Sequence, residues 1–219
     1  IESTNGSGQD DRNETTAAQH MTIRLVIFIL FVLVVSKVNG QLLDAIALDS
    51  VHTYTSLEKA LLEPEKTYRL DLSGKKLKEL PESIRDLKNL NALDLGSNKL
   101  KVVPEWLGEM KYLQELRIAR NKLVDFPVLI CKLIHLKRLD LSRNALTGLP
   151  PCIGELTELT SLDLWSNDLA EFPEEMEKLD KLRFMDLRAI MFEEPEMERI
   201  EGLVPKAKVY FSQPCNCGM

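Results

Sequence analysis

The sequence has few of the residues from which catalytic and metal sites are built. Its 219 residues include three histidines and four cysteines, and no H-E-x-x-H, G-x-S-x-G or phosphate-loop motif is present. The formal net charge of -6 gives no long-range attraction to nucleic acid or to anionic lipid. We therefore predict that the protein is not an enzyme, needs no cofactor and binds no nucleic acid.

The first forty residues read as two segments that precede the folded part. Residues 1–20 are polar and have almost nothing apolar to bury, which predicts disorder, and we interpret Met21 as the true start. The eleven apolar residues from Leu25 to Val35 are typical of a signal peptide and short for a membrane span. We predict a signal peptide at 21–40, cleaved before Gln41, so that no stable membrane span is left. The alternative is an uncleaved membrane anchor.

A fixed repeat organises the rest of the chain. The asparagines recur every 23 residues, and so do the prolines that follow them, at Asn98, Asn121, Asn144 and Asn167, and at Pro81, Pro104, Pro127, Pro150 and Pro173. A period of 20–29 residues with the pattern L-x-x-L-x-L-x-x-N-x-L is typical of a stacked repeat array. Such an array presents an extended binding surface instead of a catalytic cleft.

Six repeat units run from 68 to 192, and each contributes one short strand. Because side chains alternate along a strand, two apolar residues of each strand face the interior and the residue between them faces outward. The inward pairs are Leu70/Leu72, Leu93/Leu95, Leu116/Ile118, Leu139/Leu141, Leu162/Leu164 and Met185/Leu187. The pattern predicts an α/β solenoid with a parallel sheet on one face and helical or irregular return segments on the other.

The four repeated asparagines stand where the chain leaves each strand and turns into the interior. Backbone groups at such a turn must find hydrogen-bond partners, and an asparagine side chain both donates and accepts. We predict a structural ladder in which Asn98, Asn121, Asn144 and Asn167 bond to the backbone of their own turn and the next. Lys75 and Ile190 occupy the equivalent positions in the end units, outside the ladder.

The two ends of the array are predicted to be caps. Residues 41–67 form the N-terminal cap, with a helix at 56–62 whose capping box has Thr55 as N-cap and Glu58 at N3. Residues 193–219 break the period and form a C-terminal cap with a cysteine-containing tail. It comprises a short amphipathic helix ending at Pro205 and a last strand at 209–211.

The cysteines predict neither a disulfide nor a metal site. Cys131 and Cys152 lie on successive return segments but two positions out of register, so we expect two unpaired thiols at the edge of the core. Cys215 and Cys217 supply two ligands, whereas structural zinc takes four. A short apolar stripe on the return side, which we interpret as packing, is formed by Trp106, Leu129 and Cys152.

The repeat consensus L-x-x-L-x-x-L-D-L-S-x-N-x-L-x-x-L-P-x-x-I is clearest in residues 133–153. It resembles the 23-residue leucine-rich repeat of Ras-group and plant intracellular proteins and of many small bacterial proteins. The ends, at 56–72 and 209–217, resemble small exported leucine-rich repeat proteins of Bacteroidetes-type bacteria. The resemblance implies a horseshoe with a concave sheet and a role in protein–protein contact. It implies no catalytic residue.

The outward side chains of the strands form the candidate binding surface. Its central column, Asp71, Asp94, Arg117, Asp140, Asp163 and Asp186, is acidic except for one arginine. Exposed aromatic residues beside arginines are typical of interface centres. The alternatives are a solvated face and a local cation–π pair between Trp165 and Arg188. We predict that the partner-binding residues are Trp165, Phe184, Arg188, Arg143, Arg120, Arg117, Asp140, Asp163 and Asp186.

The sequence therefore predicts a non-enzymatic module that binds a protein or peptide on its concave face and is secreted, periplasmic or displayed on the cell surface. Two alternatives stay open at this point. One is a structural envelope protein without a specific partner, and the other is an intracellular signalling scaffold of the Ras-group kind. The identity of the partner and the oligomeric state do not follow from the sequence.

Overall fold

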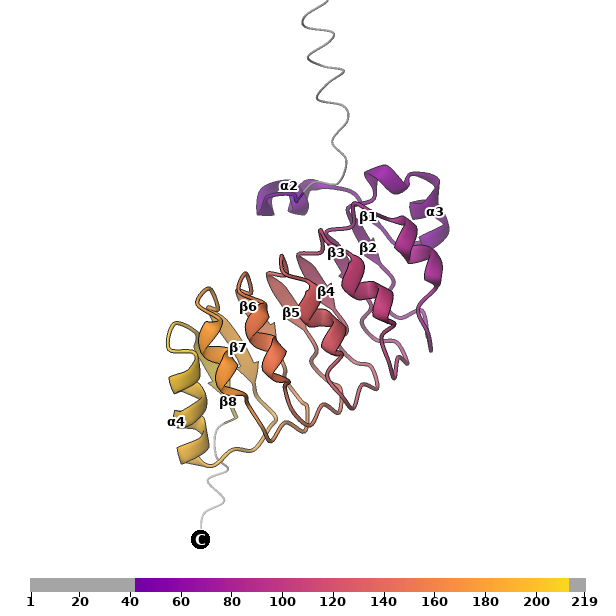
Figure 1. Cartoon of the computed structure of the whole chain (residues 1–219). Helices are drawn as coiled ribbons and strands as arrows, with labels where there is room; N and C mark the ends of the chain where they lie inside the picture. Colours follow the sequence, from indigo (N-terminus) through magenta and orange to yellow (C-terminus); the bar gives the residue numbers. More distant parts are fainter. Residues whose placement is uncertain (1–41, 213–219) are drawn as a thin grey trace, which may run out of the picture. The chain divides into compact units, whose positions relative to one another are not determined.

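The computed structural model describes residues 42–212. The predicted leader, the polar segment before it, and Cys215 and Cys217 lie outside the described residues. Eight strands form one open parallel sheet in which each strand pairs with the next along the chain (Figure 1). The strands are β1 (Thr53–Tyr54), β2 (Arg69–Asp71), β3 (Ala92–Asp94), β4 (Glu115–Arg117), β5 (Arg138–Asp140), β6 (Ser161–Asp163), β7 (Phe184–Leu187) and β8 (Lys208–Phe211).

Short 3-10 helices carry the chain back between strands and line the other side of the sheet (Figure 1). A proline stands at the N-cap of each of the five repeat helices. Proline suits this position because its φ angle is fixed near the helical value and it needs no hydrogen-bond partner for a backbone N–H. The helices are η2 (Glu82–Asp86), η3 (Glu105–Glu109), η4 (Val128–Lys132), η5 (Pro151–Glu155) and η6 (Glu174–Lys178).

The core is a set of leucine ladders, as the repeat predicted. Leu70, Leu93, Leu116, Leu139 and Leu162 pair in register from β2 to β6, and each is at most 2 % exposed. A buried leucine stabilises the fold by roughly 1.5–3 kcal/mol, so these ladders hold the stack together. The residues between the inward pairs face outward, which confirms the predicted strand register.

The asparagine ladder is present, but its direction differs from the prediction. The Asn98 amide donates to the carbonyls of Leu95 in its own turn and of Leu72 in the preceding repeat, both at 2.9 Å. Its carbonyl oxygen accepts the N–H of Leu77, also in the preceding repeat. Each asparagine therefore ties its turn to the repeat before it, and not to the one after it. The same pattern continues at Asn121, Asn144 and Asn167.

Helices flank both ends of the stack. Helix α3 (Leu57–Leu62) is N-capped by Ser56, whose hydroxyl accepts the N–H of Lys59, so the predicted cap at Thr55 is wrong by one residue. Helix α4 (Glu194–Leu203) buries Ile200 and Leu203. Three further elements were not predicted, the helix α2 (Ala45–Ser50), the strand β1 and the turn η1 (Pro64–Lys66).

The prediction of unpaired thiols is wrong, because Cys131 and Cys152 form a disulfide with Cα atoms 5.8 Å apart. The geometry of the repeat explains the pairing. A Cβ atom at Gly108 would lie 2.8 Å from the carbonyl oxygen of Leu129, and one at Gly154 would lie 2.4 Å from that of Glu175. Each of these pairs is 21 residues apart, the same separation as the two cysteines. Stacked return segments thus bring a residue close to the one 21 positions later.

Candidate strand-face groove

The outward side chains of the sheet line a groove of about 470 Å³ that runs across the strands from β1 to β7. We call it the strand-face groove. Two columns of side chains form most of it, one from the first position of each strand and one from the third. Its polar and aromatic lining residues are Asp49, Thr53, Arg69, Asp71, Asp94, Glu115, Arg117, Arg138, Asp140, Ser161, Asp163 and Phe184.

The N-terminal segment extends past the first strand and reaches the edge of this groove. Leu43 donates its N–H to the Asn91 side chain and accepts a hydrogen bond from Gln114 at 2.7 Å. Arg69 donates to the carbonyl of Leu48 and pairs with Asp49. The segment is therefore held against residues that precede β3 and β4, and Asp49 at the end of α2 lines the groove. The predicted cap covers more of the sheet than the first repeat alone.

Each aspartate of the central column has a structural hydrogen bond that the sequence analysis missed. Asp94 accepts the N–H of Gly96 at 2.7 Å, and Asp163 accepts the N–H of Trp165 at 3.0 Å. The same bond to the backbone two residues later recurs at Asp71, Asp140 and Asp186. An Asp side chain commonly closes a turn in this way. The recurring Asp-Leu-Ser or Asp-Leu-Gly at the strand ends was the available signal.

Arg117 interrupts the acidic column, as predicted, and bridges its neighbours on both sides. Its guanidinium lies 3.4 Å from Asp94 and 3.0 Å from Asp140. Burial nevertheless raises the pKa of Asp94 above its ordinary value, against the opposing effects of the Gly96 N–H and of Arg117. The charge of Arg117 is thus shared between two carboxylates of the groove.

A second ion-pair cluster lies at the beginning of the strands and was not predicted. Glu115 on β4 bonds to Arg69 at 3.0 Å and to Arg138 at 3.2 Å, and Arg69 also pairs with Asp49 at 3.2 Å. Arg69 and Glu115 belong to strands that are two apart in the sheet, so their side chains reach across β3. Ala92 makes this possible, since its small side chain lies between them in the first column.

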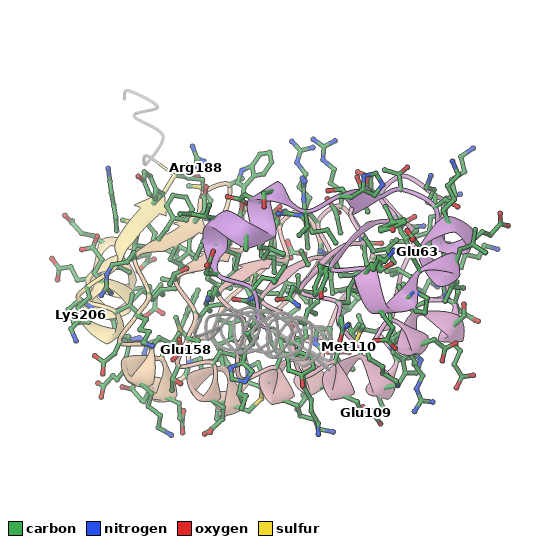
Figure 2. All side chains as sticks on the ribbon, turned by 90° about the horizontal axis from the view of Figure 1, so that it is seen from above. Glu63, Glu109, Met110, Glu158, Arg188 and Lys206 are labelled. Atoms are coloured by element: carbon green, nitrogen blue, oxygen red, sulfur yellow. A yellow bond between two sulfur atoms is a disulfide. The ribbon has the colours of Figure 1, made fainter. Side chains whose placement is uncertain are left out.

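The predicted aromatic cluster divides into two groups. The guanidinium of Arg143 lies 4.1 Å from the centroid of the Trp165 ring, so the cation–π partner of Trp165 is Arg143, and not Arg188 as in the alternative interpretation. Arg188 instead bonds to both carboxylate oxygens of Asp186, and Figure 2 places it on the side of the molecule opposite the row of short helices. The Phe184 ring packs against Tyr210, with centroids 5.0 Å apart.

The groove therefore takes in only part of the predicted site. Its lining includes Arg117, Asp140, Asp163 and Phe184. The other predicted residues belong to its rim or to the turns beyond the strands. Arg120 and Arg143 occupy turn positions with φ angles of 54°, and Asp186 is buried beneath Arg188. We call the remaining group the rim cluster, and its members are Trp165, Arg143, Arg188, Arg120 and Asp186.

On the return side, a pocket beside Trp106 has a volume of about 40 Å³, far smaller than the strand-face groove. Leu129 is buried in the core, and Trp106 and Cys152 pack partly buried against it, in keeping with the interpretation of this stripe as packing. Within residues 42–212, no group of three or more histidine, cysteine or acidic side chains is placed to hold a metal ion. The same residues include no helix that is long and apolar enough to cross a membrane.

Stacked parallel strands, an internal asparagine ladder and 3-10 return segments define a leucine-rich repeat solenoid of the α/β class. The family profile described as leucine rich repeat matches residues 65–123 and 111–169. These residues therefore carry leucine-rich repeats, the repeat type of protein-interaction modules. No curated protein resembles the chain closely enough to count as a match.

Solved structures with the same fold come from bacteria and plants. A leucine-rich repeat protein of Leptospira interrogans is 32% identical with a TM-score of 0.57, over 73% of this chain and 48% of that one. Internalin C2 of Listeria monocytogenes is 23% identical with a TM-score of 0.57, over 72% and 66%. The ectodomain of the receptor kinase GASSHO1/SCHENGEN3 of Arabidopsis thaliana is 29% identical with a TM-score of 0.56, over 68% and 19%.

The chain thus spans about half the length of the Leptospira protein. The likeness to internalin C2 shows the fold alone. None of the three comparisons identifies the Bacteroidetes-type relatives or the repeat subtype that the sequence ends suggested.

Proposed function

We propose that this protein binds another protein or a peptide in the strand-face groove, without catalysis. The observation that carries the proposal is the groove itself, which crosses the strands from β1 to β7 and is lined by outward side chains. The inward residues of the same strands form the core. The outward residues are therefore available for recognition at little cost to folding.

The plant ectodomain offers independent support. It was solved in complex with CASPARIAN STRIP INTEGRITY FACTOR 2, and this chain covers 19% of it, so a leucine-rich repeat ectodomain that is similar over part of its length binds a partner. The proposed surface also includes the rim cluster, because the exposed part of Trp165 adds rigid apolar area next to the groove. Aromatic residues and arginines contribute most strongly to affinity at protein interfaces.

A matched pair of bulky substitutions tests the proposal. Ser161→Trp fills the groove from a position that faces out of the sheet, and Thr157→Trp places the same bulk on an exposed return segment. Full-length protein with either substitution, and the unmodified protein, would be used to capture partners from the source cells. Partners that are captured by both the unmodified protein and the Thr157→Trp protein should not be captured by the Ser161→Trp protein. Equal recovery by all three would rule out the groove as the binding site.

We further propose that the protein is exported. The Cys131–Cys152 disulfide supports an oxidising compartment, since disulfides are rare in reducing compartments, and the apolar run from Leu25 to Val35 fits a signal peptide. Expressed from Met21 in a secreting host, the exported protein should begin at Gln41. An intact mass that retains residues 21–40 would contradict cleavage at this site.

A further inference from the structure

The charged side chains in the strand-face groove do not balance one another. Six carboxylates line it, from Asp49, Asp71, Asp94, Glu115, Asp140 and Asp163, against three arginines, Arg69, Arg117 and Arg138. Each of these arginines already contacts at least one carboxylate of the groove. Any further charge that the groove recognises must therefore be positive.

Two of the six carboxylates have no ion pair among the described residues. Asp71 accepts the N–H of Ser73 at 2.8 Å, and Asp163 accepts that of Trp165 at 3.0 Å. Each of these bonds uses one carboxylate oxygen, and both residues line the groove. The other four carboxylates are paired with arginines. The charge available to a partner is thus concentrated at two positions, one near each end of the groove.

The environment of Asp163 suits a basic side chain in particular. Phe184 lines the groove from the adjacent strand, so its ring offers a wall for the methylene groups of a lysine or arginine. Asp163 is half-buried, and burial is the main cause that raises its pKa above the ordinary value, with Asp140 and Asp186 adding to it. The Trp165 N–H and, to a smaller extent, Arg188 oppose this effect, and the guanidinium of Arg188 is bonded to Asp186.

The distance between the two unpaired carboxylates sets the spacing of the charges on a partner. Asp71 on β2 and Asp163 on β6 occupy the same column, four strands apart. At about 4.8 Å per strand this is about 19 Å, the length of roughly six residues of extended chain at about 3.3 Å each. Between them in the column lies Arg117, which pairs with Asp94 and Asp140. The positive charge of Arg117 would repel a third basic side chain halfway along the partner.

We propose that the groove recognises an extended polypeptide segment carrying two basic side chains about six residues apart, one bound by Asp71 and the other by Asp163 against Phe184. This inference rests on the proposed function and gives the partner its chemistry. It selects against uniformly basic segments as well as against acidic ones. The recognition is electrostatic and is therefore weakened by salt.

Selection from a displayed library of random twelve-residue peptides tests the inference directly. The bait is the full chain, either unmodified or with Asp71→Asn and Asp163→Asn together. Asparagine keeps an oxygen that accepts the Ser73 and Trp165 N–H groups, so only the charge is removed. Asp125→Asn is the matched control, since Asp125 is exposed and does not line the groove. Ser161→Trp, which fills the groove, identifies the peptides that bind there.

The unmodified protein should enrich peptides with two lysines or arginines about six positions apart. A synthetic copy of an enriched peptide should bind the Asp71→Asn/Asp163→Asn protein about tenfold more weakly or worse, because two charged hydrogen bonds are lost. Its binding to Asp125→Asn should be unchanged. Enriched peptides that lack the basic pair but no longer bind the Ser161→Trp protein would overturn the inference about charge. The groove would then remain a binding site. If no enriched peptide loses its binding with Ser161→Trp, both the charge inference and the proposed peptide binding in the groove would be overturned.

Discussion

The guanidinium of Arg143 lies over the ring of Trp165, 4.1 Å from its centroid. The two residues come from successive repeats, and the arginine belongs to the turn that follows its strand, where its φ angle is 54°. One face of the indole is therefore already covered by the guanidinium. Trp165 is thus a partly exposed residue with Arg143 as its cation–π partner, and not an isolated aromatic residue.

Trp165→Ala should weaken partner binding by about tenfold, equivalent to about 1.4 kcal/mol. The loss is smaller than for a fully buried interface anchor, which typically exceeds 2 kcal/mol, because Arg143 already occupies one face of the ring. Stability should change little, since an exposed cation–π contact contributes about 0.5–1 kcal/mol. A binding titration with an identified partner, beside a denaturant melt, measures both effects.

Leu164→Ala is the control for this substitution. Leu164 is the preceding residue, points into the core and is fully buried, so its truncation should cost roughly 2–5 kcal/mol of unfolding free energy. Equal destabilisation by Trp165→Ala and Leu164→Ala would show that the Trp165 side chain contributes to the core.

The sequence predicted those parts of the structure that the period determines. The inward leucines and the positions of the asparagines follow from a repeat of 23 residues, since each strand of the array pairs with its neighbours at that offset. The partner of Trp165 did not follow from the period. Arg188 occupies the same column as Trp165, but its guanidinium pairs with the Asp186 carboxylate, and Arg143 reaches the ring from the turn of the preceding repeat.

The disulfide escaped prediction for a different reason. Register was counted along the strands, where equivalent residues are 23 apart, whereas the return segments bring residues 21 apart into contact. Gly108 approaches Leu129 and Gly154 approaches Glu175 with this offset. The glycines at the positions equivalent to Cys131 were the signal, because only a close approach of neighbouring backbones requires them. The ion pair between Arg69 and Glu115 depends on the rotamers of the two side chains. The repeat pattern of the sequence therefore does not predict it.

Removing the disulfide should destabilise the protein measurably. Replacing Cys131 and Cys152 together by serine opens a loop of sequence separation 21 and should cost about 2–4 kcal/mol. Denaturant melts of the two proteins, each with and without dithiothreitol, provide the measurement. Reductant should lower the midpoint of the unmodified protein and leave that of the double serine variant in place. A midpoint insensitive to both changes would mean that the link between η4 and η5 contributes nothing to stability.

The asparagine ladder gives a prediction with an internal control. Asn144 donates to the carbonyls of Ile118 and Leu141 and accepts the N–H of Leu123, so Asn144→Ala leaves backbone groups unpaired and should cost roughly 1–3 kcal/mol. Lys75 has the equivalent position in the first unit and is exposed. Lys75→Ala should leave the denaturation midpoint almost unchanged, and similar losses at the two positions would contradict the assignment of the ladder.

Asp163 provides a test that depends on pH. Burial raises the pKa of its carboxyl in the folded protein, so the folded state binds its proton more tightly than the unfolded chain does. Its ionisation therefore opposes folding, and the stability that the protonated form provides is lost as the pH rises through the folded-state pKa. Asp163→Asn keeps the acceptor for the Trp165 N–H and removes the charge.

The asparagine variant should consequently be the more stable protein at pH 7. Its advantage should shrink as the pH falls and vanish below about pH 4, near the ordinary pKa of aspartate, where the native carboxyl is protonated in both states. Chemical denaturation of both proteins across this range gives the difference directly. Asp125→Asn, at an exposed position, should show no such pH-dependent gain. A stability difference at Asp163 that stays constant with pH would mean that burial does not oppose ionisation there.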